Sequence, residues 1–141
     1  MNDDTIIIII IIYNIQRMQG KSVYVGLLIF ICLDAIFLYL NNHWFSTQVI
    51  EIQRVTMMVK PTGIILSYIV LAFAFWYFVL RTNRPIWEAA LLGFVINATY
   101  ELTNYSVFKK WKLSTVFMDS LWGGVLWGAS AMITYELFSK N

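Results

Sequence analysis

Charged residues are scarce in this chain of 141 residues: 13% are Asp, Glu, Lys or Arg, whereas 60% are hydrophobic. Soluble domains usually carry about twice that charged fraction. The shortage excludes an ordinary soluble protein and makes the lipid bilayer the expected partner. The net charge of +2 is small, and the basic residues are scattered along the chain, so the sequence predicts no nucleic-acid-binding surface.

Cysteine and histidine each occur once, as Cys32 and His43. A single cysteine excludes a disulfide framework, and no spacing in the chain resembles a zinc site. Cys32 lies inside an apolar run and is expected to be a buried structural thiol. No motif indicates a catalytic residue or a bound cofactor, and no metal ligands can be assigned.

The first 21 residues form an extension of low complexity, with seven consecutive isoleucines from Ile6 to Ile12. The apolar run gives a helix of about 16 Å, well short of the roughly 30 Å hydrocarbon core, so it cannot span the membrane alone. The acidic residues before it and the lack of a small-residue cleavage site argue against a signal peptide. We expect residues 1–21 to be loosely held or to lie at the membrane surface.

Four apolar segments in residues 22–141 predict an all-α, multi-pass membrane protein, with four transmembrane helices in an antiparallel bundle. The expected spans are residues 22–40, 62–80, 86–108 and 113–138. The first span contains one charged residue, Asp34. Its Leu, Ile, Val and Phe residues contribute roughly −5 kcal/mol to insertion, against about +3 kcal/mol for a central aspartate. The span is therefore expected to insert despite Asp34.

The connections between these spans carry their own predictions. Apolar residues at helical spacing from Phe45 to Val59 predict a short helix on the membrane surface. Pro61 is expected to open the second span. The short turn before Pro85 predicts that the second and third spans pack antiparallel. Lys and Arg residues divide evenly between the two sides of a four-span topology, so the positive-inside rule leaves the orientation open.

The third and fourth expected spans have faces suited to contact with other helices. The third carries a stripe of small and polar residues at spacings of four and three, formed by Ala89, Gly93, Asn97, Glu101 and Asn104. The fourth carries a ridge of small residues, formed by Ser120, Gly124 and Gly128. This ridge also makes homo-oligomerisation a hypothesis. Trp122 and Trp127 are interpreted as side chains that fill gaps between helices.

Three carboxyl groups fall at one depth. Asp34, Glu101 and Asp119 each lie six or seven residues from a helix end, or about 9 to 10 Å, and four spans place these ends on one side of the membrane. The expected polar site comprises Asp34, Glu101, Asp119, Asn97, Thr103 and Asn104. Such a cluster cannot stay fully ionised at low dielectric. It must share protons, bind a cation or pair with a base such as Lys109 or Lys60.

Three functions are compatible with this site. The leading hypothesis is a small proton- or cation-coupled transporter or channel, since acidic residues inside membranes commonly mark ion pathways. The first alternative is a structural or assembly protein whose carboxyl groups only hold helices together. The second alternative is a membrane-embedded, lipid-modifying enzyme. The enzyme is the weakest of the three, because no acidic pair at a spacing of three or four residues places two metal ligands on one helix face.

Three motifs surround the carboxyl groups: LDAIFLYL in the first expected span, ATYELTN at the end of the third, and WKLSTVFMDSLWG at the start of the fourth. In these motifs, and over approximately residues 22–138, the sequence resembles a family of small, four-span bacterial membrane proteins of unknown function. The matching positions are Asp34, Tyr100, Glu101, Leu102, Thr103, Asn104, Trp111, Asp119, Trp122 and Gly123. The family usually has aspartate at the position of Glu101, and Trp-Pro where this chain has Trp111 and Lys112. The resemblance implies the fold and the site residues but no activity.

Overall fold

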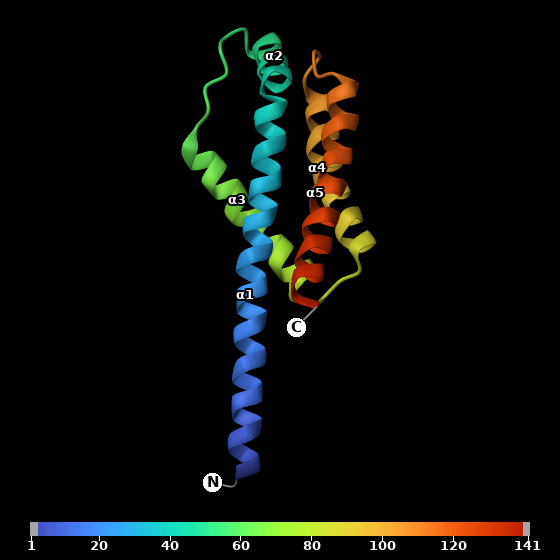
Figure 1. The fold of residues 1–141 in the computed structure, drawn as a ribbon. Coiled ribbons are helices and arrows are strands. Elements are labelled where there is room, and N and C mark those ends of the chain that lie inside the picture. The colour runs from blue at the N-terminus through green and yellow to red at the C-terminus, as the bar shows by residue number, and fades with distance from the viewer. Residues whose placement is uncertain (1–2, 140–141) are drawn as a thin grey trace.

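The structure, a computed structural model, describes the backbone of residues 3–139 and the side chains of residues 20–138. Within this part of the chain every regular element is helical (Figure 1). In chain order the elements are α1 (Asp3–Leu40), α2 (Asn42–Gln53), α3 (Pro61–Phe75), the π-helical turn η1 (Trp76–Leu80), α4 (Ile86–Val107) and α5 (Leu113–Ser139). The predicted all-helical class is confirmed.

Helix α1 is continuous over 38 residues. At 1.5 Å per residue it is about 57 Å long, nearly twice the thickness of the hydrocarbon core. Its second half, Gly20–Leu40, is long and apolar enough to cross a membrane. Before Gly20 the backbone continues the same helix and extends beyond the other elements (Figure 1). That the first residues lie at the membrane surface stays a prediction.

Three segments of the described chain are long and apolar enough to cross a membrane: Gly20–Leu40, Pro61–Leu80 and Leu113–Phe138. Their ends lie within two residues of the first, second and fourth expected spans. Helix α4 has sufficient length at 22 residues, but polar residues such as Asn97 and Glu101 lower its hydropathy. The molecule is therefore a membrane protein with at least three helices suited to spanning.

Helices α4 and α5 lie side by side and make the most extensive contact in the described chain (Figure 1). Their backbones touch where Gly93 faces Gly123. A Cβ atom added to Gly123 would lie 2.6 Å from the Gly93 carbonyl oxygen, and one added to Gly93 would collide with the Gly123 carbonyl and the Trp127 ring. Gly124 and Gly128 also face α4, at wider separations. The stripe of the third expected span therefore packs against the small residues of α5.

An aromatic cluster joins α1, α3 and α5. Phe30 of α1 stacks on Phe75 of α3 with ring centroids 4.9 Å apart, and both rings meet Trp127 of α5 edge-on at 5.5 Å. All three side chains are fully buried. Trp127 thus fills a gap between helices, as its position in an apolar span predicts.

Helix α3 departs from the expected antiparallel bundle. It crosses α1 obliquely and diverges from α4 beyond the short turn that joins them (Figure 1), and among the described residues it makes no extensive contact with α4. The prediction that the second and third spans pack together is therefore wrong. Helix α3 has no charged residue, and its small residues four apart, Gly63 and Ser67, are exposed. Leu66 and Val70 are more than 60% exposed and suit contact with lipid.

Helix α2 contacts the hairpin between α4 and α5 through the Gln48 side chain. Gln48 is only 1% exposed; its amide nitrogen donates to the Lys110 carbonyl at 2.7 Å, and its amide oxygen accepts from the Thr115 hydroxyl at 3.3 Å. The predicted short helix is present, but it ends at Gln53, and both Val55 and Val59 are exposed after it. A polar residue, rather than the apolar stripe alone, anchors this helix.

Cys32 is exposed, and the prediction of a buried thiol is wrong. The residue lies two positions from both Phe30 and Asp34, which face the other helices. Because neighbours two apart point to nearly opposite sides of a helix, Cys32 faces away from the core of the molecule.

Candidate functional site

Asp34 joins three helices through two hydrogen bonds. The Tyr68 hydroxyl of α3 donates to Asp34 Oδ2 at 2.8 Å, and the Trp122 indole N–H of α5 donates to Asp34 Oδ1 at 3.0 Å. The Trp122 ring also stacks on Phe37, with centroids 4.2 Å apart and planes within 7°. Trp122 therefore does more than fill a gap, because it holds a carboxyl group of α1 against α5.

Asp119 lies one helical turn before Trp122 on α5 and contacts α4. The Asn97 side-chain amide donates to Asp119 Oδ2 at 3.2 Å and to the Asp119 carbonyl at 3.1 Å. Residues three apart share a helix face, so Asp119 and Trp122 lie on adjoining parts of α5. Through these two side chains, α5 connects Asn97 of α4 with Asp34 of α1.

Glu101 is the most enclosed of the three carboxyl groups, with 2% of its surface exposed. Its Oε2 accepts a hydrogen bond of 2.7 Å from the indole N–H of Trp111 in the α4–α5 hairpin. Glu101 lies one turn beyond Asn97 on the same face of α4. The hairpin therefore folds back over this carboxyl group and shields it.

Asp119 is the central member of the set, because it lies within electrostatic range of both Glu101 and Asp34. If two of these carboxyl groups were ionised, their negative charges would repel each other at low dielectric. The three side chains come from α1, α4 and α5 and lie toward the hairpin end of the molecule. We refer to Asp34, Glu101 and Asp119 as the carboxyl layer.

The hydrogen-bond donors to the carboxyl layer are uncharged. The bases named from the sequence, Lys60 and Lys109, are exposed. In the described part of the chain, none of the salt bridges reaches the carboxyl layer; the salt-bridged pairs are Arg84 with Glu88 and Lys112 with Glu51. A buried carboxylate without a cation is costly, so the proton content of the layer becomes the central chemical question.

Two further polar side chains lie close to the layer in sequence, and their buried atoms lack partners within the described chain. These atoms are the Asn104 side-chain nitrogen, one turn beyond Glu101, and the hydroxyl of Ser120, which follows Asp119. Buried polar groups normally form hydrogen bonds. Ordered water is the usual partner of such groups in protein interiors.

Thr103 does not belong to this layer. It is exposed and donates to the Thr99 carbonyl of its own helix at 2.7 Å. It lies two residues after Glu101 and therefore points to nearly the opposite side of α4. Of the six predicted site residues, Asn97 and Asp119 bond to each other, Asp34 bonds to Trp122 one turn from Asp119, and Glu101 and Asn104 lie on the Asn97 face of α4.

Three aromatic donors of the site escaped sequence reasoning: Tyr68, Trp111 and Trp122. Trp111 and Trp122 occur in the quoted motifs, which is the available signal. Trp122 stands in an apolar segment, where an indole usually indicates packing, and Trp111 stands among the lysines of the hairpin. Tyr68 lies in an uncharged span, where nothing in the sequence indicates a polar partner. To identify these donors, one must know how each helix is rotated about its own axis.

The ligand geometry expected of a metal centre does not occur in the described part of the chain, where no three His, Cys, Asp or Glu side chains gather closely enough to hold an ion. Each carboxyl group instead has its own Tyr, Trp or Asn donor. Such an arrangement can bind, release and share protons without convergent ligands.

Comparisons with known proteins give one family. A family model described as "Predicted membrane protein (DUF2177)" matches residues 20–136, which is most of the chain and nearly the stretch over which the resemblance was seen. No curated protein and no solved structure shows a significant match.

Proposed function

The chain belongs to this DUF2177 family of predicted membrane proteins, and we propose that it exchanges protons at the carboxyl layer as a small proton-coupled transporter or channel. The observation that carries the proposal is that three carboxyl groups from α1, α4 and α5 each accept a hydrogen bond from an uncharged donor, and that no salt bridge in the described part of the chain reaches them. Acidic side chains inside a membrane are costly and typically serve proton relays or ion paths.

The connectivity of the layer supports proton sharing. Glu101 and Asn97 are one turn apart on α4, Asn97 bonds to Asp119 at 3.2 Å, and Asp119 is one turn from Trp122, which bonds to Asp34 at 3.0 Å. Because Asp119 lies within electrostatic range of the other two carboxyl groups, a charge on one disfavours a charge on the next. A proton added to one carboxyl group therefore changes the affinity of its neighbours for protons.

The structural alternative rests on the same hydrogen bonds. Tyr68 and Trp122 connect Asp34 to two other helices, and such bonds between membrane helices contribute about 0.6 kcal/mol each on average. An assembly role predicts that neutral variants lose stability and that the protein carries no flux. A proton-exchange role differs from the assembly role because it requires a titratable group at these positions.

Proton flux into proteoliposomes tests the proposal. The purified chain is reconstituted with a pH-sensitive dye inside, and an imposed potential drives proton entry. We expect flux above that of empty liposomes, lost in Asp119→Asn and strongly reduced in Glu101→Gln. Glu136→Gln is the matched control, because Glu136 is an exposed carboxyl group near the far end of α5 and its neutralisation should leave the flux unchanged.

Each alternative has its own result. No flux from the wild-type chain, together with reduced stability of Asp119→Asn, would replace the proposal with the structural role. Metal-dependent turnover of a lipid would instead support the enzyme. Equal flux in the wild type and in both carboxyl variants would place the proton path elsewhere in the chain.

We also propose that α4 crosses the membrane as a fourth span. Its 22 residues reach about 33 Å, and several apolar side chains, such as Leu91 at 53% and Leu102 at 53%, are exposed. The buried polar residue Glu101 lowers the average hydropathy without facing lipid. Reporters fused to the two termini test this: four spans place them on the same side of the membrane, whereas three place them on opposite sides.

A further inference from the structure

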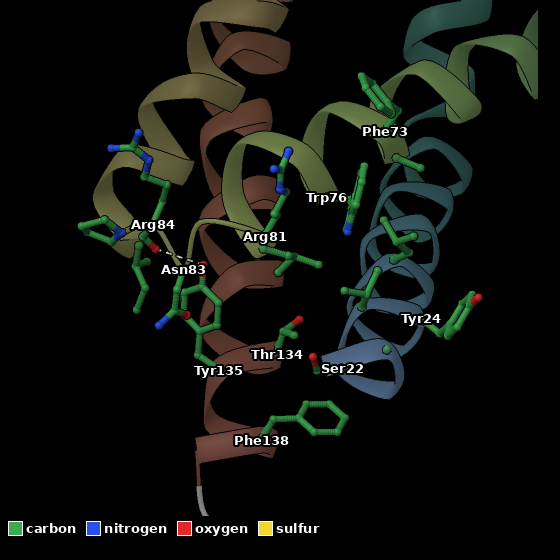
Figure 2. Close-up of a pocket in the computed structure, with 17 residues that line it drawn as sticks. Ser22, Tyr24, Phe73, Trp76, Arg81, Asn83, Arg84, Thr134, Tyr135 and Phe138 are labelled. Atoms are coloured by element: carbon green, nitrogen blue, oxygen red, sulfur yellow. Dashed lines mark hydrogen bonds between the residues drawn. The ribbon is translucent and has the colours of Figure 1, made fainter. Parts of the chain in front are cut away.

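A cavity lies at the other end of the molecule from the carboxyl layer. Four segments surround this open space of about 1190 Å³: residues 20–27 in the middle of α1, the end of α3 with η1, the start of α4 and the end of α5 (Figure 2). Ser22, near the start of the apolar half of α1, and Phe138, at the end of the apolar part of α5, both line it. The cavity therefore lies at the level where spanning helices meet the headgroup region of a bilayer.

The residues that line the cavity change from apolar to polar and basic along the membrane normal. Leu27 and Phe73 form apolar wall further inside the spans, whereas Arg81, Asn83 and Arg84 lie in the turn after η1. In Figure 2 the indole nitrogen of Trp76 points into the space between α1 and α5. An amphipathic molecule with an anionic headgroup and an apolar tail matches this division.

One of the two arginines is available to an anion. Arg84 forms a salt bridge of 3.2 Å with Glu88. The Arg81 guanidinium lies over the Tyr77 ring, 4.9 Å from its centroid, and in the described part of the chain it has no carboxylate partner. Stacking on an aromatic ring orients a guanidinium and leaves its N–H edge free to donate.

We propose that this cavity binds an anionic phospholipid, with the phosphate at Arg81 and an acyl chain along the wall formed by Leu27 and Phe73. Basic pockets between membrane helices recognise lipid headgroups in this way, and the volume exceeds the roughly 300 to 1,000 Å³ of most small-molecule sites. The proposal is independent of the carboxyl layer, which lies toward the hairpin.

Quenching of Trp76 fluorescence by brominated lipids tests the site. The full chain is reconstituted in nanodiscs that contain either brominated phosphatidylglycerol or brominated phosphatidylcholine, and Trp76→Phe supplies the signal of the other tryptophans for subtraction. We expect the Trp76 component to be quenched at lower mole fractions of the anionic lipid. Arg81→Gln should reduce this preference about fivefold, as loss of one cation near the membrane surface predicts.

Two control variants test whether the preference depends on the charge at Arg81, and two further outcomes test whether a phospholipid is the occupant. Arg81→Lys keeps the charge and should retain most of the preference, and Lys60→Gln removes an exposed cation at the other end and should retain all of it. Equal quenching by the two lipids, or an unchanged preference in Arg81→Gln, would overturn the proposal. Displacement of the brominated lipid by free glycerol phosphate would also overturn it, because it would indicate a site for phosphate alone. Shielding of Trp76 from lipid in a cross-linked dimer would overturn it as well, because it would indicate that a second copy of the chain fills the cavity.

Discussion

The close contact between α4 and α5 predicts that Gly93→Ala destabilises the protein. A Cβ atom at this position would collide with the carbonyl oxygen of Gly123 and with the Trp127 ring. A backbone oxygen cannot rotate aside, so the two helices must separate. Separation also weakens the Asn97–Asp119 hydrogen bond, which crosses the same interface at 3.2 Å.

The expected magnitude follows from these two losses. Overpacking typically costs about 1 to 3 kcal/mol, and one hydrogen bond adds about 0.5 to 1.5 kcal/mol. Alanine also raises helix propensity by up to about 1 kcal/mol, which partly masks the loss. Gly124→Ala gives the same propensity gain, but its Cβ atom would lie an ordinary 3.4 Å from its nearest neighbour, the Ala90 carbonyl oxygen. The difference between the two variants should therefore be about 1.5 to 4.5 kcal/mol.

Unfolding in mixed micelles, with increasing dodecyl sulfate and detection by circular dichroism and fluorescence, gives the free energy for both variants. Gly124→Ala should be as stable as the wild type or slightly more stable, and Gly93→Ala clearly less stable than both. Equal stability of the two alanine variants would show that the helices do not touch at Gly93, and the assignment of this interface would have to be abandoned.

The docking of α2 on the hairpin gives two further predictions, measured by the same unfolding assay. Gln48→Leu should lower stability by about 1 to 3 kcal/mol, because it removes the buried amide that bonds to Lys110 and Thr115; an unchanged midpoint would mean that α2 is not anchored there. Lys112→Ala should cost less than about 1 kcal/mol, because its salt bridge with Glu51 joins side chains that are 44% and 40% exposed; a larger loss would contradict the view that this pair is well hydrated.

Helix ends and distances along a helix were readable from the sequence because they depend on local chemistry. Pro61 suits the first turn of a helix, and α3 begins there. Helix α1 ends at Leu40 and α5 begins at Leu113, so Asp34 and Asp119 lie at equal distances from these helix ends, since the rise per residue is fixed. Distance along a helix therefore follows from the sequence without knowledge of its neighbours.

Rotation of each helix about its axis was harder to predict. Thr103 was grouped with Glu101 by depth alone, although two residues of separation turn its side chain to the other side of α4. Tyr68 and Trp122 bond to Asp34, yet both stand in apolar sequence where several faces look alike. The oblique path of α3 has the same cause, because a helix that is apolar on every side specifies no single partner.

The aromatic cluster separates the two polar ends of the molecule. Phe30 lies one turn from Asp34 toward the cavity, and it packs with Phe75 and Trp127 in a layer without exposed surface. Such a layer excludes water and opposes proton passage, because it offers no groups to hydrogen-bond to a proton carrier.

Beyond the cluster, toward the cavity, α5 offers buried hydroxyl groups at Ser130 and Thr134, and Thr134 donates to the Ser130 carbonyl of its own helix. In this conformation the aromatic cluster closes the path between the carboxyl layer and the cavity, and the Trp111 side chain covers Glu101 on the hairpin side. Net proton flux would therefore require the cluster to open. Flux from the wild-type chain would consequently imply a second conformation in which Phe30 and Trp127 have parted.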